Sequence, residues 1–289
     1  HRQADQCIAQ DAARKRFELG PLEALARGIL CNALVCLAVW LAIGARSVTD
    51  KILAIIPHVR TKDRKEIALA SWTHSHGEMA EAFAGLRSVL DSAAYRDQAR
   101  VILAASSLPE EGKTSACCNL ATACARTGQR TLLIDFDLRR PRIGGIFPMP
   151  RGHQGLLEYL ASRNTRPGDI TYASGCPNLD VMASRVSGEA RPSELVGSAK
   201  VADLLAWARN NYDRVVIDAP PLGIVSDALS LAGQVDCVLV MARPGISRKR
   251  AVRHTIRRFR DVGISAIAVV MNDVDHSKFA YHGYGPYYH

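Results

Sequence analysis

The sequence predicts an α/β fold in which a mostly parallel sheet is covered by helices on both faces. Short apolar runs typical of buried strands alternate with helical segments from Val101 to Met271, and this alternation is typical of parallel sheets with crossover helices. Three of the predicted strands lead directly into a glycine-containing loop or an aspartate. Because ligands bind outside the carboxyl ends of parallel strands, these residues predict a ligand site at that edge of the sheet.

The composition is that of one large domain with additional segments. Of the 289 residues, 48% are hydrophobic, and the formal net charge of +9 favours anionic partners such as nucleotides, lipid surfaces or nucleic acid. The eight cysteines include no C-x-x-C pair and no cluster at zinc spacing. They predict reduced, small apolar residues of a cytosolic domain rather than a redox or zinc site. Because the chain begins with His1 rather than Met, we expect a piece of a longer protein.

The first part of the chain predicts a membrane anchor. Residues 1–21 are polar and of mixed charge, as at the end of a stalk, and Gly28 to Ala45 carry no charge. With its flanks, the segment 22–45 approaches the roughly 20 residues that span a bilayer. More Lys and Arg follow it than precede it, which favours a cytoplasmic position for the rest of the chain. The alternative is a buried core helix. Residues 46–76 predict a cytoplasmic linker, after which a helical pattern at residues 77–91 opens a domain expected over 77–272.

The segment VILAASSLPEEGKTSACCNLA, from Val101 to Ala121, predicts a strand, a tight loop and a helix, which is the context of a phosphate-binding P-loop. We expect Lys113 to reach the β- and γ-phosphates of a nucleotide and the Thr114 hydroxyl to hold Mg²⁺. The strict pattern has Gly where Ser107 stands, and the carboxylates of Glu110 and Glu111 fit an anion site only if both point outward. The alternative is an ordinary strand-turn-helix with a surface lysine. The loop residues expected to bind the nucleotide are Ser107, Pro109, Glu111, Gly112, Lys113, Thr114 and Ser115.

Two further predicted strands end in aspartates. Asp135 and Asp137 follow the apolar run 131–134, and strand alternation would place both carboxylates on one side, facing a cation such as Mg²⁺ or accepting a proton. Arg139, Arg140 and Arg142 come next and could meet phosphates; the alternative is a solvated turn. The strand of DRVVIDAPPLG ends in Asp218, which after a P-loop predicts a Walker B residue that holds Mg²⁺ through water.

The remaining segments complete the alternation. Helices are predicted at 155–161 and 192–210, and strands at 179–183, 236–242 and 264–271. The strongly basic helix SRKRAVRHTIRRFRDVG, residues 247–263, presents either a solvated face or a face for lipid or nucleic acid. The tail, residues 273–289, holds half of the chain's eight tyrosines among Gly and Pro residues. In an accessible tail, four tyrosines would be suitable phosphoryl acceptors because they could enter a neighbour's cleft: Tyr281, Tyr284, Tyr287 and Tyr288.

Together these motifs resemble the bacterial tyrosine kinases (BY-kinases) of capsule and exopolysaccharide systems. The resemblance covers residues 78–289 and rests on SSLPEEGKTSACCNLA, LLIDFDLRRP, NLDVMASR with RPSEL, YDRVVIDAPP, AVVMNDVD and the tyrosine-rich end. It implies the P-loop NTPase fold, with Walker A at Ser106–Thr114, Walker A′ at Asp135 and Asp137, and Walker B at Asp218. The N-terminal part is similar to the end of a chain-length-determinant (polysaccharide co-polymerase) domain, which implies that residues 1–21 are periplasmic.

The resemblance implies an ATP- and Mg²⁺-dependent protein-tyrosine autokinase of the bacterial inner (plasma) membrane, with a cytoplasmic kinase domain. Such a kinase phosphorylates its tail and regulates the chain length, polymerisation and export of a polysaccharide. Its expected partners are neighbouring copies of the chain, the polymerase and export machinery and a cognate tyrosine phosphatase, but not nucleic acid. Mg²⁺ is expected near Thr114, Asp135 and Asp218, and Asp137 is expected to accept the tyrosine proton. The expected catalytic residues are Lys113, Asp135, Asp137 and Asp218.

The chain departs from the family pattern at three places, one of which is a connector after the membrane helix that is short for the family. Glu110 replaces the Gly of P-G-E-G-K, and the self-association motif E-x-x-R-x-x-R appears as Glu81, Ala84 and Arg87, without its middle Arg. Two other functions stay open on this basis. A MinD/ParA-type positioning ATPase has the same fold but carries an extra Lys where this chain has Leu108. A degenerate nucleotide-binding regulator of a polysaccharide exporter would use the same domain without catalysis.

Overall fold

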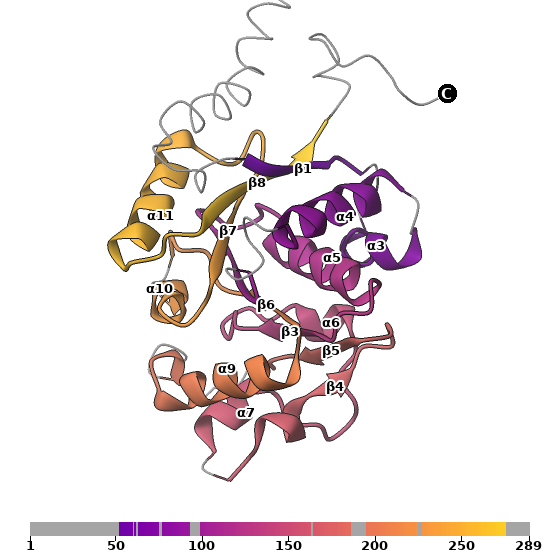
Figure 1. Ribbon diagram of the computed structural model, residues 1–289, viewed down its shortest axis with the longest axis vertical. Helices are drawn as coiled ribbons and strands as arrows, with labels where there is room; N and C mark the ends of the chain where they lie inside the picture. The colour runs from indigo at the N-terminus through magenta and orange to yellow at the C-terminus, as the bar shows by residue number, and fades with distance from the viewer. Residues whose placement is uncertain are drawn as a thin grey trace, which may run out of the picture. The chain divides into compact units, whose positions relative to one another are not determined.

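The computed structural model describes residues 52–59, 61, 63–74, 77–92, 99–162, 164–185, 195–224 and 227–275, within one compact unit of residues 47–275 (Figure 1). The predicted stalk at 1–21, the predicted membrane helix at 22–45 and the four tail tyrosines lie outside the described residues. In the part of the chain that the structure describes, no helix is long and apolar enough to cross a bilayer.

A single sheet of eight strands organises the domain. The strand order is β1-β8-β7-β2-β6-β3-β5-β4, and every neighbouring pair is parallel except β4 with β5. The predicted mostly parallel sheet is therefore confirmed. The strands are β1 Ile52–Pro57, β2 Val101–Ser106, β3 Thr131–Asp135, β4 Tyr172–Ala173, β5 Leu179–Met182, β6 Arg214–Asp218, β7 Cys237–Ala242 and β8 Ile267–Val274.

Helices cover both faces of this sheet, as predicted. Figure 1 shows α4 and α5 on one side of the sheet and α10 and α11 on the other. The helices are α2 Arg64–Ala68, α3 Ala70–Thr73, α4 Glu78–Leu90, α5 Lys113–Ala125, α6 Ile143–Ile146, α7 Leu156–Ala161, the 3₁₀ helix η3 Pro167–Ile170, α9 Ala199–Asn211, α10 Asp227–Ala232 and α11 Lys249–Asp261.

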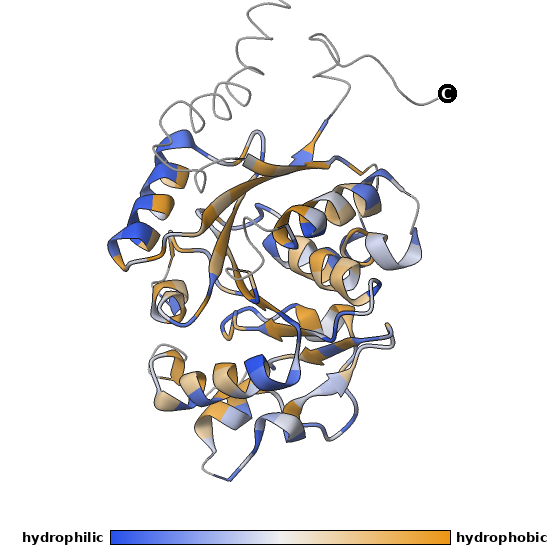
Figure 2. Cartoon of the chain, in the orientation of Figure 1, coloured by the Kyte–Doolittle hydropathy of each residue, from blue (hydrophilic) through white to orange (hydrophobic). Residues whose placement is uncertain are grey.

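The core lies between the sheet and its helices. All residues of β2, β3, β6 and β7 are buried, as expected for parallel strands covered on both faces. The small side chains of α5 let it pack closely on the strands, and the described cysteines are buried and form no disulfide. On α11 a stripe of four side chains is buried, and Figure 2 shows hydrophilic residues along the rest of the helix. The stripe consists of Val252, Thr255, Ile256 and Phe259.

The structure corrects the predicted linker at 46–76. Residues 52–57 form an edge strand that pairs in parallel with β8, and α2 and α3 contact α5. The short apolar run resembles a connector because its partner strand lies more than 200 residues further along the chain, where no local pattern can reveal it. Pro57 closes β1 at its end and at the edge of the sheet, where a missing N–H group is tolerated.

Element boundaries also differ from the predicted ones. The helix predicted at 192–210 is described as α9 from Ala199, and β8 continues three residues past the predicted end, to Val274. The short elements α6, α10 and β4 were not predicted. With at most six residues each, they are too short to show a hydrophobic periodicity.

Candidate active site

The P-loop joins β2 to α5 and has the predicted strand-loop-helix geometry. Gly112 caps α5 with a φ of 83°, and a Cβ atom there would lie 1.8 Å from Nδ2 of Asn272. Glycine is therefore required at this position. The Asn272 side chain donates a hydrogen bond to the carbonyl of Glu111 at 3.0 Å, so β8 holds the loop in place.

Ser107 stands where the pattern has its first glycine, and its side chain contacts a residue outside the loop. Ser107 is buried, and its hydroxyl lies 3.1 Å from the hydroxyl of Thr255 on α11. Its side chain thus faces the helix packed beneath the P-loop, and the departure from the strict pattern leaves the loop intact.

The two loop glutamates behave differently, and the condition that both point outward is not met by Glu111. Its carboxylate is buried and accepts hydrogen bonds from the backbone N–H groups of Ser107 and Leu108, at 2.7 and 3.0 Å, and from the hydroxyl of Ser247. Burial raises its pKa, while these bonds favour the charged form. Two loop N–H groups are thereby occupied by Glu111, which leaves those of the first turn of α5 to face a ligand.

Glu110 points outward, as expected. Its carboxylate accepts a hydrogen bond from Arg64 at 3.1 Å, and its carbonyl accepts one from Arg243 at 3.2 Å. The φ of Glu110 is 64°, in the left-handed region that glycine adopts without strain. The residue that stands at the pattern's glycine thus adopts a backbone conformation that favours glycine.

Lys113, Thr114 and Asp218 form the buried centre of the site. The Lys113 ammonium pairs with Oδ1 of Asp218, and the Thr114 hydroxyl donates to Oδ2 of the same carboxylate at 2.7 Å. Burial opposes the charge on Lys113, but the charge and hydrogen bond of Asp218, together with Cys117 and Asp137, raise the pKa of the lysine. Strand β6 thus presents its last residue directly to the first two residues of α5.

Asp135 ends β3 directly beside Asp218 in the sheet. Its carboxylate accepts hydrogen bonds from the backbone N–H groups of Asp137, Arg142 and Ile143, at 3.2, 2.9 and 2.9 Å. Burial, followed by the charge of Asp218, raises the pKa of Asp135 to about 8. This carboxylate therefore organises the loop after β3.

Asp137 lies beyond the end of β3 and lines the pocket. The predicted strand alternation does not apply to it because the strand stops at Asp135, so the two carboxylates have different surroundings. Asp137 is half-buried, accepts a hydrogen bond from the N–H group of Arg140 at 3.1 Å, and has a pKa raised chiefly by burial.

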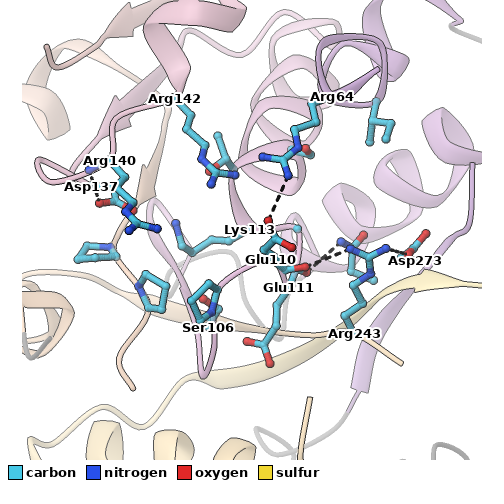
Figure 3. A pocket seen from close by; sticks show the side chains of 18 of the residues that line it. Arg64, Ser106, Glu110, Glu111, Lys113, Asp137, Arg140, Arg142, Arg243 and Asp273 are labelled. Carbon is cyan, nitrogen blue, oxygen red and sulfur yellow. Dashed lines mark hydrogen bonds and ion pairs between the residues drawn. The ribbon is translucent and has the colours of Figure 1, made fainter. Parts of the chain in front are cut away.

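A pocket of about 660 Å³ opens at the carboxyl ends of the strands (Figure 3). Figure 3 shows Lys113 between Asp137 and Arg140 on one side and Arg243 and Asp273 on the other. Arg139 also lines the pocket, while its Nε contacts Asp227 at 3.4 Å. The cationic side chains that line the pocket are Arg64, Lys113, Arg139, Arg140, Arg142 and Arg243.

The lining residues that were not predicted as site residues include Arg64, Arg243 and Asn272. Arg64 follows β1 and Arg243 follows β7, and neither belongs to a short motif, whereas Asn272 lies in β8 within the segment AVVMNDVD, which was used only as a mark of the family. Only the strand order brings these elements beside the P-loop. A prediction of which strand ends meet there would have been needed to find them.

The donor set fits Mg²⁺ bound together with a nucleotide. In the described part of the chain, no group of three or more His, Cys, Asp or Glu side chains could hold a metal by itself. Mg²⁺ in phosphoryl-transfer sites uses one or two carboxylates with phosphate oxygens and water. The adjacent Thr114 hydroxyl and Asp218 carboxylate match that need, and the Lys113 ammonium already occupies a cation position on Asp218.

Comparison with known proteins agrees with this geometry. The model of the AAA domain family matches residues 100–261. The model of the formate/nitrite transporter family matches residues 3–99. Within that second range, the described residues form β1 to α4 of the domain. The tyrosine-protein kinase Etk of Escherichia coli K12 is 29% identical over 267 residues, which are 92% of this chain and 36% of Etk. The chain thus spans about a third of the length of the curated relatives it matches.

Solved structures show the same similarity. The Etk kinase domain has a TM-score of 0.70 at 29% identity, over 82% of this chain and 95% of that one. The kinase domain of VpsO has a TM-score of 0.58 at 30% identity, over 73% and 96%. The septum site-determining protein MinD of Pyrococcus horikoshii is more distant, with a TM-score of 0.50 at 21% identity over 59% and 68%, and this likeness concerns the fold alone.

Proposed function

We propose that this chain, which belongs to the AAA domain family and to the bacterial tyrosine kinases, is an ATP-dependent protein-tyrosine kinase that phosphorylates its own C-terminal tyrosine cluster. The observation that carries the proposal is the meeting of Lys113, Thr114, Asp218 and Asp137 at the carboxyl ends of neighbouring strands. These residues supply a phosphate-binding cation, two metal donors and a base in one pocket.

Bound Mg-ATP supplies the phosphoryl group and a metal charge that offsets the negative charge of the phosphates. Lys113 exchanges its partner Asp218 for the β- and γ-phosphates, which frees the carboxylate for the metal together with Thr114. The first-turn N–H groups of α5 and the pocket arginines hold the phosphate oxygens. Asp137 takes the proton of the attacking tyrosine hydroxyl, and a pKa raised by burial makes it a better proton acceptor than an exposed aspartate.

The wider setting follows from the uncharged segment and from the relatives. In this proposal, residues 22–45 form a membrane helix. The kinase domain lies on its cytoplasmic side, and residues 1–21 lie in the periplasm. Neighbouring copies supply tails as substrates, and the chain regulates exopolysaccharide or capsule chain length, polymerisation and export with a cognate tyrosine phosphatase. Support comes from similarity to Etk and, at 32% identity, to the succinoglycan biosynthesis transport protein ExoP of Rhizobium meliloti.

The alternatives have less support. A MinD/ParA-type ATPase would carry a lysine at Leu108, and the likeness to MinD concerns the fold alone. A degenerate regulator would be favoured if Glu110 distorted the P-loop. The left-handed backbone of Glu110, together with the intact Gly112, Lys113 and Thr114, argues for a competent loop instead.

One reaction separates the three functions. The purified chain is incubated with Mg-ATP, and both phosphotyrosine and released phosphate are measured, with intact-mass spectrometry to count the phosphoryl groups. A tyrosine kinase gives phosphotyrosine in the tail, a positioning ATPase releases phosphate only, and a degenerate regulator gives neither. The matched control is Lys113→Met, which keeps the apolar stem of the lysine and removes its charge. Normal autophosphorylation of that folded variant would remove the P-loop assignment.

Transfer between chains is tested by mixing two variants. A Lys113→Met chain with an intact tail serves as substrate for an active chain whose four tail tyrosines are Phe. The proposal expects label on the tail of the inactive chain. An unmodified tail rules out transfer between chains, and wild-type label at Tyr95, Tyr159, Tyr172 or Tyr212 instead of the tail would show that the tail is not the acceptor.

A further inference from the structure

An apolar stretch of the pocket wall follows directly after the end of β6, in a pocket that also holds many charged side chains. Pro220 and Pro221 follow Asp218 directly, Ile224 comes three residues later, and all three line the pocket. Ile224 is 61% exposed, more than any other large apolar side chain among the described residues. Phosphates and Mg²⁺ gain nothing from such a wall, whereas an apolar or aromatic group does.

The wall lies beside the candidate base. Strands β3 and β6 pair in parallel with Asp135 opposite Asp218, and the N–H group of Phe136 donates to the carbonyl of Asp218 at 2.8 Å. Asp137 and Pro220 therefore each lie two residues beyond a matched pair, on chains that leave neighbouring strands about 5 Å apart. Both residues line the pocket, so the first proline belongs to the same site as the carboxylate that would accept the tyrosine proton.

The wall is also held in a fixed position relative to the P-loop. The N–H groups of Leu222 and Gly223 donate to the carbonyls of Ser106 and Ser107, at 2.9 and 3.2 Å. A Cβ atom at Gly223 would lie 2.3 Å from the Ser107 carbonyl oxygen, so the close approach depends on glycine. A ligand resting on this wall would therefore be positioned accurately against Lys113, at the end of the same loop.

We propose that Pro220, Pro221 and Ile224 form the seat for the aromatic ring of the acceptor tyrosine; this proposal rests on the proposed function. The pyrrolidine rings and the isoleucine offer apolar surface to the phenol ring, whose hydroxyl reaches Asp137. The hydroxyl oxygen forms the new bond to the γ-phosphorus, its proton passes to Asp137, and the bond to the β-phosphate oxygen breaks to release ADP. A water molecule has no ring and gains nothing from this seat, so the seat favours transfer over hydrolysis.

The occupant is the tyrosine-rich tail of a second copy of the chain. Asn272 and Asp273 line the same pocket, so the tail begins at its rim. Tyr281 lies six residues after Asp275, a span of about 20 Å when extended. The tail tyrosines are therefore presented within reach of pockets of this kind.

The test compares transfer with hydrolysis in the same reaction of the full chain with Mg-ATP. The variant Ile224→Ser removes the apolar rim, and Ile224→Leu restores it. The matched control is Val262→Ser, which removes an apolar side chain that is 46% exposed, follows α11 and does not line the pocket. For each variant, phosphotyrosine formed and ATP hydrolysed are measured together, and equal thermal midpoints establish that the fold is kept.

We expect the ratio of phosphotyrosine to hydrolysed ATP to fall about tenfold in Ile224→Ser. The exposed three-fifths of the isoleucine side chain, which the ring would cover, no longer contributes apolar contact. The ratio should stay near the wild-type value in Ile224→Leu and Val262→Ser. An unchanged ratio in Ile224→Ser, or an equal fall in Val262→Ser, would overturn the seat while leaving the kinase assignment intact. A wild-type chain that hydrolyses ATP without making phosphotyrosine would overturn the proposed function, and the seat with it.

Discussion

Removing the charge of Lys113 should destabilise the nucleotide-free chain and not only inactivate it. The lysine and Asp218 are 7% and 1% exposed and form a direct ion pair at the centre of the site. Breaking a buried pair by removing one partner typically costs about 3–5 kcal/mol, because the other charge is left uncompensated. In Lys113→Met the apolar stem is kept, so the loss comes from the Asp218 carboxylate, for which only the Thr114 and Cys117 donors remain.

The double variant Lys113→Met with Asp218→Asn separates charge from packing. Because the amide still accepts the Thr114 hydrogen bond and carries no charge, the double variant should recover most of the lost stability. Urea denaturation without nucleotide or Mg²⁺ is the assay. At about 2–3 kcal/mol per M, the single variant should shift the midpoint down by about 1–2 M. A single variant as stable as the wild type, or a double variant no more stable than the single one, would refute the buried-pair reasoning.

Three further predictions follow from the described contacts and the sequence. In Gly112→Ala, the positive φ and the close approach to Asn272 should strain the P-loop and weaken ATP binding at least tenfold, a change of about 1.4 kcal/mol or more that calorimetry can measure. The control is Gly128→Ala, at a φ of 87° in open space, which should strain the backbone without changing the affinity for ATP. The pKa of Asp135 is about 8 in the folded chain and about 4 in the unfolded chain, so the folded chain binds more protons between these pH values. Without Mg²⁺, the stability of the chain should therefore fall as the pH rises from about 4 to about 8. Thermal midpoints measured over this range should fall less steeply in Asp135→Asn. Deleting residues 1–46 should yield a domain that is soluble without detergent and still binds ATP. Recovery of the intact chain in the soluble fraction without detergent would count against the membrane helix. A domain unfolded by the deletion would favour the core-helix alternative.

The parts of the site that could be predicted from the sequence are those encoded within about ten consecutive residues. The P-loop, the carboxylates after β3 and the aspartate that ends β6 each combine a buried strand with the residue that follows it. A buried strand has a local signal, and its carboxyl end is a known place for ligands. These motifs therefore identified both the fold and the site.

The parts that could not be predicted depend on contacts between distant segments. The edge position of β1 depends on β8, and Arg64 lines the pocket only because β1 delivers α2 to the P-loop. The inward turn of Glu111 depends on Ser247, 136 residues further on. A single sequence gives the chemistry of each segment but not which strand ends become neighbours, and the missing information is topological.

The two departures in the P-loop illustrate this difference in physical terms. Read locally, Ser107 and Glu110 weaken the phosphate-loop pattern, because each replaces a glycine. In the fold, the serine side chain is satisfied by Thr255 on α11, and Glu110 keeps the left-handed backbone while Arg64 and Arg243 bind its oxygens. Each departure thus has a partner from an element distant in sequence. The catalytic competence of this loop depends on that surrounding frame as much as on its own seven or eight residues, so removing Arg64 or Arg243 tests the loop as directly as changing Glu110 does.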